Sequence, residues 1–145
     1  MINQPNIDLA SYRIDKAKDL FSQAKLLHKN KKYDGSINRS YYAIFNAVRG
    51  LLALVELDSS KHSGILSYFD RYFVKTKIFD KEFSKIAHKA FDTRQENDYE
   101  DFYNPSSEES ESQIKNAIKF ISEIEKKLSQ LVTGEIKLPS IRENK

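Results

Sequence analysis

The sequence predicts an all-α protein, an antiparallel bundle of four to five helices in one domain. Only four glycines and three prolines occur among 145 residues, so few positions favour turns or interrupt helices. Apolar residues recur at intervals of three and four over long stretches, which is the spacing of one face of an α-helix. A chain of this length buries one core. We therefore expect a single domain over residues 1–134, followed by a flexible tail over residues 135–145.

The first helix is expected between Asp8 and about Lys31. Its apolar residues lie three, four or eight positions apart and so share one face: Leu9, Ala17, Leu20, Ala24 and Leu27. The sequence Asn-Lys-Lys-Tyr-Asp-Gly over residues 30–35 is typical of a turn. Either Asp34 or Ser36 is then placed to cap a second helix.

The second helix has a wide apolar stripe, and we expect it at the centre of the bundle. This stripe consists of Ile37, Tyr41, Ile44, Phe45, Val48, Leu51, Leu52 and Val55. After it, Asp58-Ser59-Ser60 offers N-capping side chains for a third helix from about His62 to Thr76. One side of the third helix carries four large residues: Ile65, Phe69, Tyr72 and Phe73.

A fourth helix is expected to begin after Asp80, which would cap it. Its inward positions are Phe83, Ala87, Ala90 and, eleven residues after Phe83, Arg94. A guanidinium on an inward stripe needs a carboxylate, a phosphate or a solvent-lined cleft as its partner. Arg94 is therefore the first candidate functional residue, and an ion pair with Asp98, four residues on, is the simplest alternative.

The helical periodicity stops over residues 97–107, where Asn104-Pro105 indicates a loop. Ser106 and Glu109 then have the spacing of a capping box at the start of a fifth helix. The apolar stripe of this helix consists of Ile114, Ile118, Ile121, Ile124, Leu128 and Leu131. Gly134 is placed to end the helix.

Charge is distributed unevenly along the chain. The formal net charge is +3, yet residues 91–112 contain eight acidic residues and a single basic one, Arg94. A nucleic-acid interface needs a continuous basic face, which this chain can offer only outside that acidic segment. The acidic segment itself is suited to contact a basic protein surface.

Cysteine is absent, which excludes a disulfide framework, a thiolate nucleophile and a thiolate metal site. No apolar stretch approaches the roughly 18 to 20 residues of a membrane span. The three histidines do not have the spacing of metal ligands, and no glycine-rich phosphate loop occurs. We therefore expect a cytoplasmic protein without membrane contact, metal or cofactor.

Three short motifs follow one another along the chain: Arg39-Ser40-Tyr41-Tyr42-Ala43, then Lys61-His62-Ser63-Gly64, then Arg94 with Asp98-Tyr99. In order and spacing they resemble the HEPN domain family over roughly residues 8–132, most closely its small stand-alone prokaryotic members. The resemblance implies a helical homodimer that binds nucleotides or cleaves RNA. It also implies a small nucleotidyltransferase as a frequent partner.

In nucleolytic HEPN proteins, the catalytic motif is an Arg, four to six intervening residues and a His, and a dimer brings two copies into one cleft. Arg94 matches the Arg of this motif, but Tyr99 stands where the His is expected, directly after Asp98. A phenol, whose ordinary pKa is about 10, is a poor general base near neutral pH, whereas an imidazole near about 6.5 is a good one. The motif here therefore favours binding or partner contact over efficient cleavage.

Three further residues belong to the candidate binding site. Arg39 could hold a phosphate near a helix N-terminus or form a surface ion pair. Tyr42 points about 100° away from the core position Tyr41, and could stack on a base or line a dimer interface. His62 could support the start of the third helix or face the cleft. Tyr41 itself is expected to be packed, with its hydroxyl hydrogen-bonded.

Three functions remain open from the sequence. The first is a HEPN protein of a toxin–antitoxin-like module that binds nucleotide or RNA and pairs with a small nucleotidyltransferase, with Tyr99 as a possible acceptor of a nucleotide. The second is a metal-independent ribonuclease in which Arg94 stabilises the phosphate and His62, Tyr99 or Asp98 transfers protons. The third is a nucleotide-binding scaffold without chemistry. The dimer is expected to form through the second and fourth helices.

Overall fold

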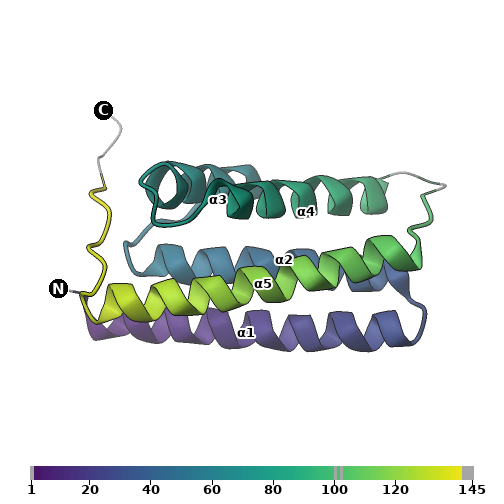
Figure 1. The fold of residues 1–145 in the computed structure, drawn as a ribbon, viewed down its shortest axis with the longest axis horizontal. Helices are drawn as coiled ribbons and strands as arrows, with labels where there is room; N and C mark the ends of the chain where they lie inside the picture. The colour runs from purple at the N-terminus through teal and green to yellow at the C-terminus, as the bar shows by residue number, and fades with distance from the viewer. Residues whose placement is uncertain (1, 100, 102, 142–145) are drawn as a thin grey trace.

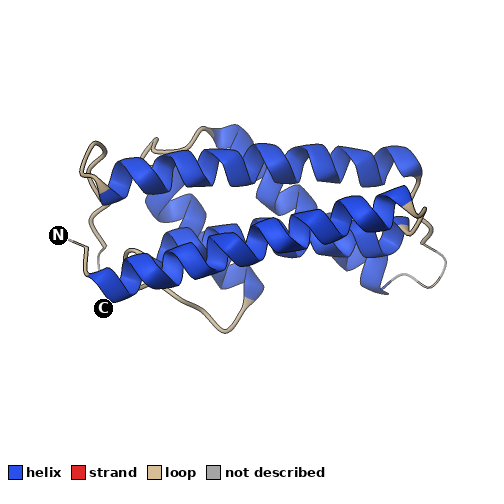
Figure 2. Cartoon of the chain, turned by 90° about the horizontal axis from the view of Figure 1, so that it is seen from below, coloured by secondary structure: helices blue, strands red, loops and turns tan. Residues whose placement is uncertain are grey.

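A computed structural model of the chain describes residues 2–99, 101 and 103–141. Its elements are α1 (Gln4–Lys29), α2 (Tyr33–Ala53), α3 (His62–Phe69), a π-helical turn η1 (Asp70–Val74), α4 (Lys81–Tyr99) and α5 (Ser107–Val132). Within the described residues no strand occurs, as Figure 2 shows. The predicted all-α fold is confirmed.

Helix α2 lies at the centre of the bundle, as its wide apolar stripe predicts. It contacts α1, α3, α4 and α5, and most of its residues are buried. Figure 1 shows α3 and α4 in a layer above α2, with α1 below it and α5 running alongside. Successive long helices run in opposite directions, so the bundle is antiparallel.

The first helix begins at Gln4, four residues before the predicted start at Asp8. Its N-cap is Asn3, whose side chain accepts a hydrogen bond from the Asn6 N–H at 3.0 Å. Pro5 lies in the first turn, where its missing N–H leaves no helical bond unmade. Polar capping therefore extends the helix beyond its apolar stripe.

The predicted caps of the second and third helices are wrong. Helix α2 already begins at Tyr33, and the Ser36 hydroxyl instead donates to the Ala24 carbonyl of α1 at 2.8 Å. The N-cap position of α3 is Lys61. In the part of the chain that the structure describes, no side chain caps either helix start. The Ser36 hydroxyl therefore joins α2 to α1 and does not cap a helix.

The third helix also differs from the prediction at its end, because the α-helix stops at Phe69 and continues as the π-helical turn η1. The Lys75 N–H donates to the Asp70 carbonyl at 2.8 Å, five residues back, which defines this wider turn. Around it, five buried aromatic rings from α3, η1, α4, α5 and the intervening turn pack edge to face or tilted: Phe69, Phe73, Phe79, Phe83 and Phe120.

Helix α5 begins with the predicted capping box, in which Ser106 and Glu109 each bond the other's backbone N–H. Gly134 follows the helix with a φ of 82°, the left-handed conformation that favours glycine. In the expected flexible tail, Ile136, Leu138 and Ile141 pack against the core, and residues 142–145 lie outside the described part of the chain. None of the described helices is long and apolar enough to span a membrane.

Candidate functional site

Arg94 of α4 points inward at α2, as its place on the apolar stripe predicts. Its side chain is only 16 % exposed. One guanidinium nitrogen, Nη2, donates to the Tyr42 hydroxyl at 2.9 Å. The guanidinium carbon lies 5.4 Å from the ring centres of both Tyr41 and Tyr42, close enough for cation–π attraction. Arg94 is therefore held by α2 as well as by its own helix.

The expected alternative partner of Arg94, Asp98, is also present. Arg94 Nε lies 2.8 Å from Asp98 Oδ2 in an i to i+4 ion pair. Among the described residues, however, this buried Nε has no aligned hydrogen-bond acceptor, so the contact is electrostatic rather than a directed bond. The guanidinium thus keeps donor capacity that its neighbours do not use.

His62, at the start of α3, joins the same group of side chains. Its Nδ1 lies 2.8 Å from the Tyr41 hydroxyl. Its ring centre is 4.2 Å from that of Phe45 and 5.9 Å from those of Tyr41 and Tyr42. We name this group, with Phe91 against Tyr41, the Arg94 cluster: Tyr41, Tyr42, Phe45, His62, Phe91, Arg94 and Asp98. His62, for which the sequence left open a place at the helix start or in the cleft, thus lies among the residues that contact Arg94.

Burial and nearby charges keep Tyr41 and His62 of the Arg94 cluster neutral. Burial raises the pKa of Tyr41 far above its ordinary value, so its hydroxyl stays protonated. Burial first, and then the charges of Arg94 and Arg49, lower the pKa of His62. A neutral imidazole accepts the Tyr41 O–H at Nδ1 in the simplest arrangement, which leaves the proton of His62 on Nε2.

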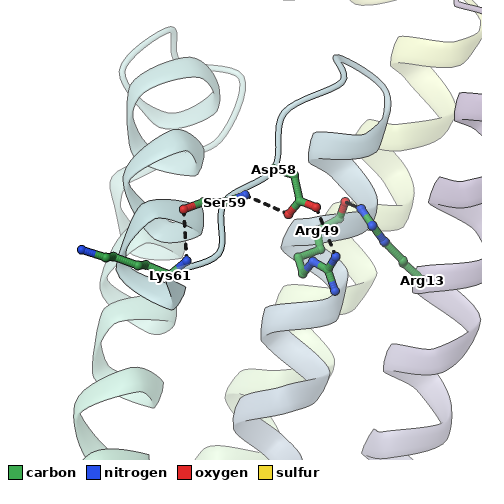
Figure 3. Close-up of polar contacts among 5 residues, drawn as sticks. All are labelled: Arg13, Arg49, Asp58, Ser59 and Lys61. Carbon is green, nitrogen blue, oxygen red and sulfur yellow. Dashed lines mark hydrogen bonds and ion pairs between the residues drawn. The ribbon is translucent and has the colours of Figure 1, made fainter.

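Arg49 is a site residue that the sequence analysis missed. It lies on α2 seven residues after Tyr42, a spacing that places both on one helix face and was available as a signal. Its Nη2 is 3.5 Å from Asp58 Oδ2, and its carbonyl accepts from Arg13 Nη1 at 3.0 Å. Figure 3 shows Arg13 of α1 and Arg49 of α2 meeting beside Asp58. Arg49 therefore anchors the loop that leads to α3.

The same loop is closed by two short bonds that fix the start of α3 (Figure 3). The Ser59 N–H donates to Asp58 Oδ1 at 2.9 Å, and the Lys61 N–H donates to the Ser59 hydroxyl at 3.2 Å. A Cβ atom on Gly64 would overlap the Ser59 side chain. The His-Ser-Gly motif is thus explained locally, since glycine lets this loop lie against α3 and sets the position of His62.

Gly64→Ala is expected to lower the free energy of unfolding by about 1 to 2 kcal/mol, because the loop must move away from α3. Rotating the Ser59 hydroxyl gives no relief, since the Ser59 Cβ would also be too close. Urea unfolding of Gly64→Ala, Ser59→Gly and the double variant measures the coupling. Strictly additive effects would show that these two residues do not meet.

Stability is expected to fall with decreasing pH in a way that depends on His62. Its pKa is lower in the folded protein than the ordinary value of about 6.5, so the unfolded chain binds more protons between those two values. The contribution of neutral His62 to the free energy of unfolding is complete above about pH 6.5, and it is lost as the pH falls through the pKa of His62 in the folded protein. Thermal unfolding at pH 7.5, 6.5 and 5.5 should show a steeper decline for the wild type than for His62→Gln. Parallel declines would contradict the assignment.

Two predicted site residues lie apart from the Arg94 cluster. Arg39 Nε donates to Gln23 at 3.0 Å and its Nη1 to Asn38 at 2.9 Å. Tyr99 is 74 % exposed at the end of α4. Within residues 2–99, 101 and 103–141, no hydrogen bond or ion pair joins either one to the cluster. The structure therefore brings together Tyr42, His62, Arg94 and Asp98, but not Arg39 or Tyr99.

A second polar group, unforeseen from the sequence, joins η1 to α4. The Ser84 hydroxyl donates to Asp70 Oδ1 and His88 Nε2 lies against Asp70 Oδ2, both at 2.6 Å. The residue types are those of a hydrolase triad, but the aspartate stands between the other two. Ser84 therefore faces no general base, and the group is an anchor rather than a nucleophilic site. Among the described residues, no three His, Asp or Glu side chains converge as metal ligands.

Comparison with known proteins finds that the family model of the HEPN domain matches residues 10–128. A UPF0332 protein of Thermotoga maritima is 38 % identical over 116 residues, which are 80 % of this chain and 88 % of that protein. Two proteins of Methanocaldococcus jannaschii, both named as putative toxins, are also similar. One is 34 % identical over 82 % of this chain and 88 % of its own, and the other 31 % identical over 84 % of each.

Proposed function

Because the chain belongs to the HEPN domain family, we propose that it is the toxin-like component of a two-protein module and binds RNA or nucleotide phosphate at the Arg94 cluster. The observation that carries this proposal is the state of Arg94. Its guanidinium is held in a fixed orientation by two tyrosine rings, the Tyr42 hydroxyl and the Asp98 carboxylate. A guanidinium oriented in advance is well suited to bind a phosphate through its terminal nitrogens.

The charges around His62 support the same proposal. Burial, and then the charges of Arg94 and Arg49, lower the pKa of its imidazole. The neutral ring therefore adds no charge of its own, and the attraction for an incoming phosphate comes from the guanidiniums. Tyr42 is half-buried, so part of its ring remains available for stacking on a base.

We propose that the site is completed by a second copy of the chain, docked through α2 and α4. Arg94 and Tyr42 join these two helices within one chain. A dimer formed across the same pair of helices would place the two Arg94 clusters near one another. The partner protein is proposed to be a small nucleotidyltransferase that contacts the acidic segment, residues 91–112. Tyr99, exposed at the end of α4 within that segment, is the candidate acceptor of a nucleotide.

The proposed transfer to Tyr99 balances as a phosphoryl substitution. The phenolic oxygen would form a bond to the α-phosphorus of a nucleoside triphosphate supplied to the partner enzyme. The bond from that phosphorus to the bridging oxygen would break, pyrophosphate would leave, and the phenolic proton would pass to solvent or to the partner. Intact-mass analysis after incubation with the partner and ATP should show one added nucleoside monophosphate. An equal mass gain in Tyr99→Phe would exclude this residue.

The binding proposal is tested with a matched pair of arginine variants. Fluorescence anisotropy with labelled single-stranded RNA, and calorimetry with ATP, should show at least tenfold weaker binding for Arg94→Gln. Arg39→Gln is the control, because Arg39 is equally charged but lies outside the cluster. Equal losses in the two variants, or no binding by the wild type to either ligand, would exclude the cluster as the binding site.

A metal-independent ribonuclease is the second candidate, and the position of His62 favours it. In the tautomer in which Nδ1–H donates to the Tyr41 hydroxyl, the Nε2 lone pair of His62 is free to abstract a 2′-hydroxyl proton, while Arg94 stabilises charge on the phosphate. Purified protein should then cleave RNA in the presence of EDTA, and both Arg94→Ala and His62→Ala should abolish the cleavage. If the RNA stays intact after incubation with a stoichiometric amount of the wild-type protein, the ribonuclease hypothesis is wrong and only binding is left.

A further inference from the structure

A shallow basic pocket lies on the outer side of η1 and the start of α4, and the proposed function does not use it. It has a volume of about 720 Å³, and four exposed cationic side chains line it: Arg71, Lys75, Lys81 and Lys85. A second pocket of about 630 Å³ shares Lys75 and Lys81 with the first and adds Lys77. The two pockets therefore form one continuous surface, which we name the basic groove.

Three acidic side chains line the basic groove, Asp70, Asp80 and Glu82, and the first and last of them contact neighbouring side chains. Asp70 is the single carboxylate of the first pocket, and both of its oxygens contact Ser84 or His88 at 2.6 Å. Glu82, at the second pocket, pairs with Lys119 of α5 at 2.8 Å. The groove as a whole thus holds five basic side chains against three carboxylates, a formal net charge of +2. Such a surface attracts a polyanion.

The basic groove is separate from the Arg94 cluster. Lys85 and Arg94 are nine residues apart on α4, which places them on opposite faces of the helix, about 180° apart. Arg94 faces α2, whereas Lys85 shares its pocket with residues of α3 and η1. A ligand in the groove would therefore not compete with one at Arg94 on the same chain.

We propose that the basic groove binds the sugar–phosphate backbone of single-stranded RNA without reading its sequence. Two adjoining shallow pockets suit a polymer better than a small molecule. No aromatic side chain lines the first pocket, and Phe79 at the second is only 2 % exposed, so bases have no surface for stacking. The exposed large apolar side chains of the described residues all lie elsewhere, which leaves the groove without an anchor for a lipid surface.

The test compares two charge reversals of equal size. Lys81→Glu/Lys85→Glu changes the groove, and Lys16→Glu/Lys126→Glu, at exposed positions of α1 and α5, changes net charge equally elsewhere. Binding of a labelled 20-nucleotide RNA of mixed sequence is measured by anisotropy over a range of salt concentrations. The groove variant should bind at least tenfold more weakly, and its slope of log K against log salt should be smaller by about 1.4, for two lost phosphate contacts. The control should change less than threefold.

The outcomes separate this proposal from that for Arg94. If RNA binding weakens in the groove variant but not in Arg94→Gln, the result supports the basic groove as the only RNA-binding site of the two. If RNA binding weakens in Arg94→Gln but not in the groove variant, the groove proposal is wrong and the Arg94 proposal is supported. Equal losses in the groove variant and the control indicate only net charge and overturn the groove as a site. Displacement of RNA by polyglutamate at the same charge concentration would overturn RNA as the ligand in favour of an acidic protein.

Discussion

Phe120→Ala is expected to lower the free energy of unfolding by about 3–5 kcal/mol, the largest effect we predict. The ring is fully buried on α5, 5.6 Å from that of Phe69 on α3 and 6.1 Å from that of Phe83 on α4. Removing it leaves a cavity where three helices meet, and the rings around it cannot collapse without moving whole helices. Since small domains are stable by roughly 5–15 kcal/mol, this change alone approaches the lower limit.

Urea unfolding followed by circular dichroism measures this effect, with an expected midpoint shift of roughly 2 M. Ile118→Ala is the matched control, because Ile118 lies on the same helix two residues earlier and is 43 % exposed. We expect it to cost less than about 1 kcal/mol. A similar loss for the two variants would mean that Phe120 does not join the upper layer to α5.

The helices themselves could be predicted from the sequence because their signals are local. The capping box at Ser106 and Glu109 and the terminal Gly134 each act within a few residues of one end of α5. The stripe predicted for this helix was wrong at Ile118, which is 43 % exposed, whereas Phe120 is fully buried. The inward position of Arg94 followed from the same periodicity, since it continues the stripe of Phe83. Such features depend on helix geometry alone.

The failed predictions depend on contacts between distant segments. Ser36 is a good capping residue in isolation, but the Ala24 carbonyl of α1 takes its hydroxyl. His62 meets the Arg94 cluster only because Arg49 and Asp58 hold the loop before α3. These contacts join segments that are far apart in the sequence, so no local sequence pattern predicts them.

The acidic segment shows the same limit for the candidate site. The sequence motif groups Asp98 with Tyr99, because the two residues are adjacent in the chain. The helix separates them, since neighbours differ by about 100° around the axis. Asp98 turns toward Arg94, whereas Tyr99 is exposed. The two side chains therefore lie on different sides of α4, one toward α2 and one toward solvent.

Arg94→Met is expected to lower the free energy of unfolding by about 1.5–3 kcal/mol, whereas Asp98→Asn should cost less than about 1 kcal/mol. Both changes break the ion pair, but only the first removes the hydrogen bond to Tyr42 and the cation from the two tyrosine rings. Methionine retains most of the stem volume, so the difference reports the charged group. Asp98 is 29 % exposed and remains hydrated when its partner changes.

The same pair of variants tests the electrostatic link to His62 by an independent measurement. Because the charge of Arg94 lowers the pKa of His62, Arg94→Met should raise that pKa toward its ordinary value in an NMR titration of the imidazole. If Asp98→Asn destabilised the protein as much as Arg94→Met and the His62 titration stayed unchanged in both, the i to i+4 ion pair would account for Arg94 by itself. If Arg94→Met instead lowers the free energy of unfolding more than Asp98→Asn and raises the pKa of His62, the guanidinium must interact with both α2 and α3. Such contacts would hold it in a fixed orientation, as a phosphate-binding site requires.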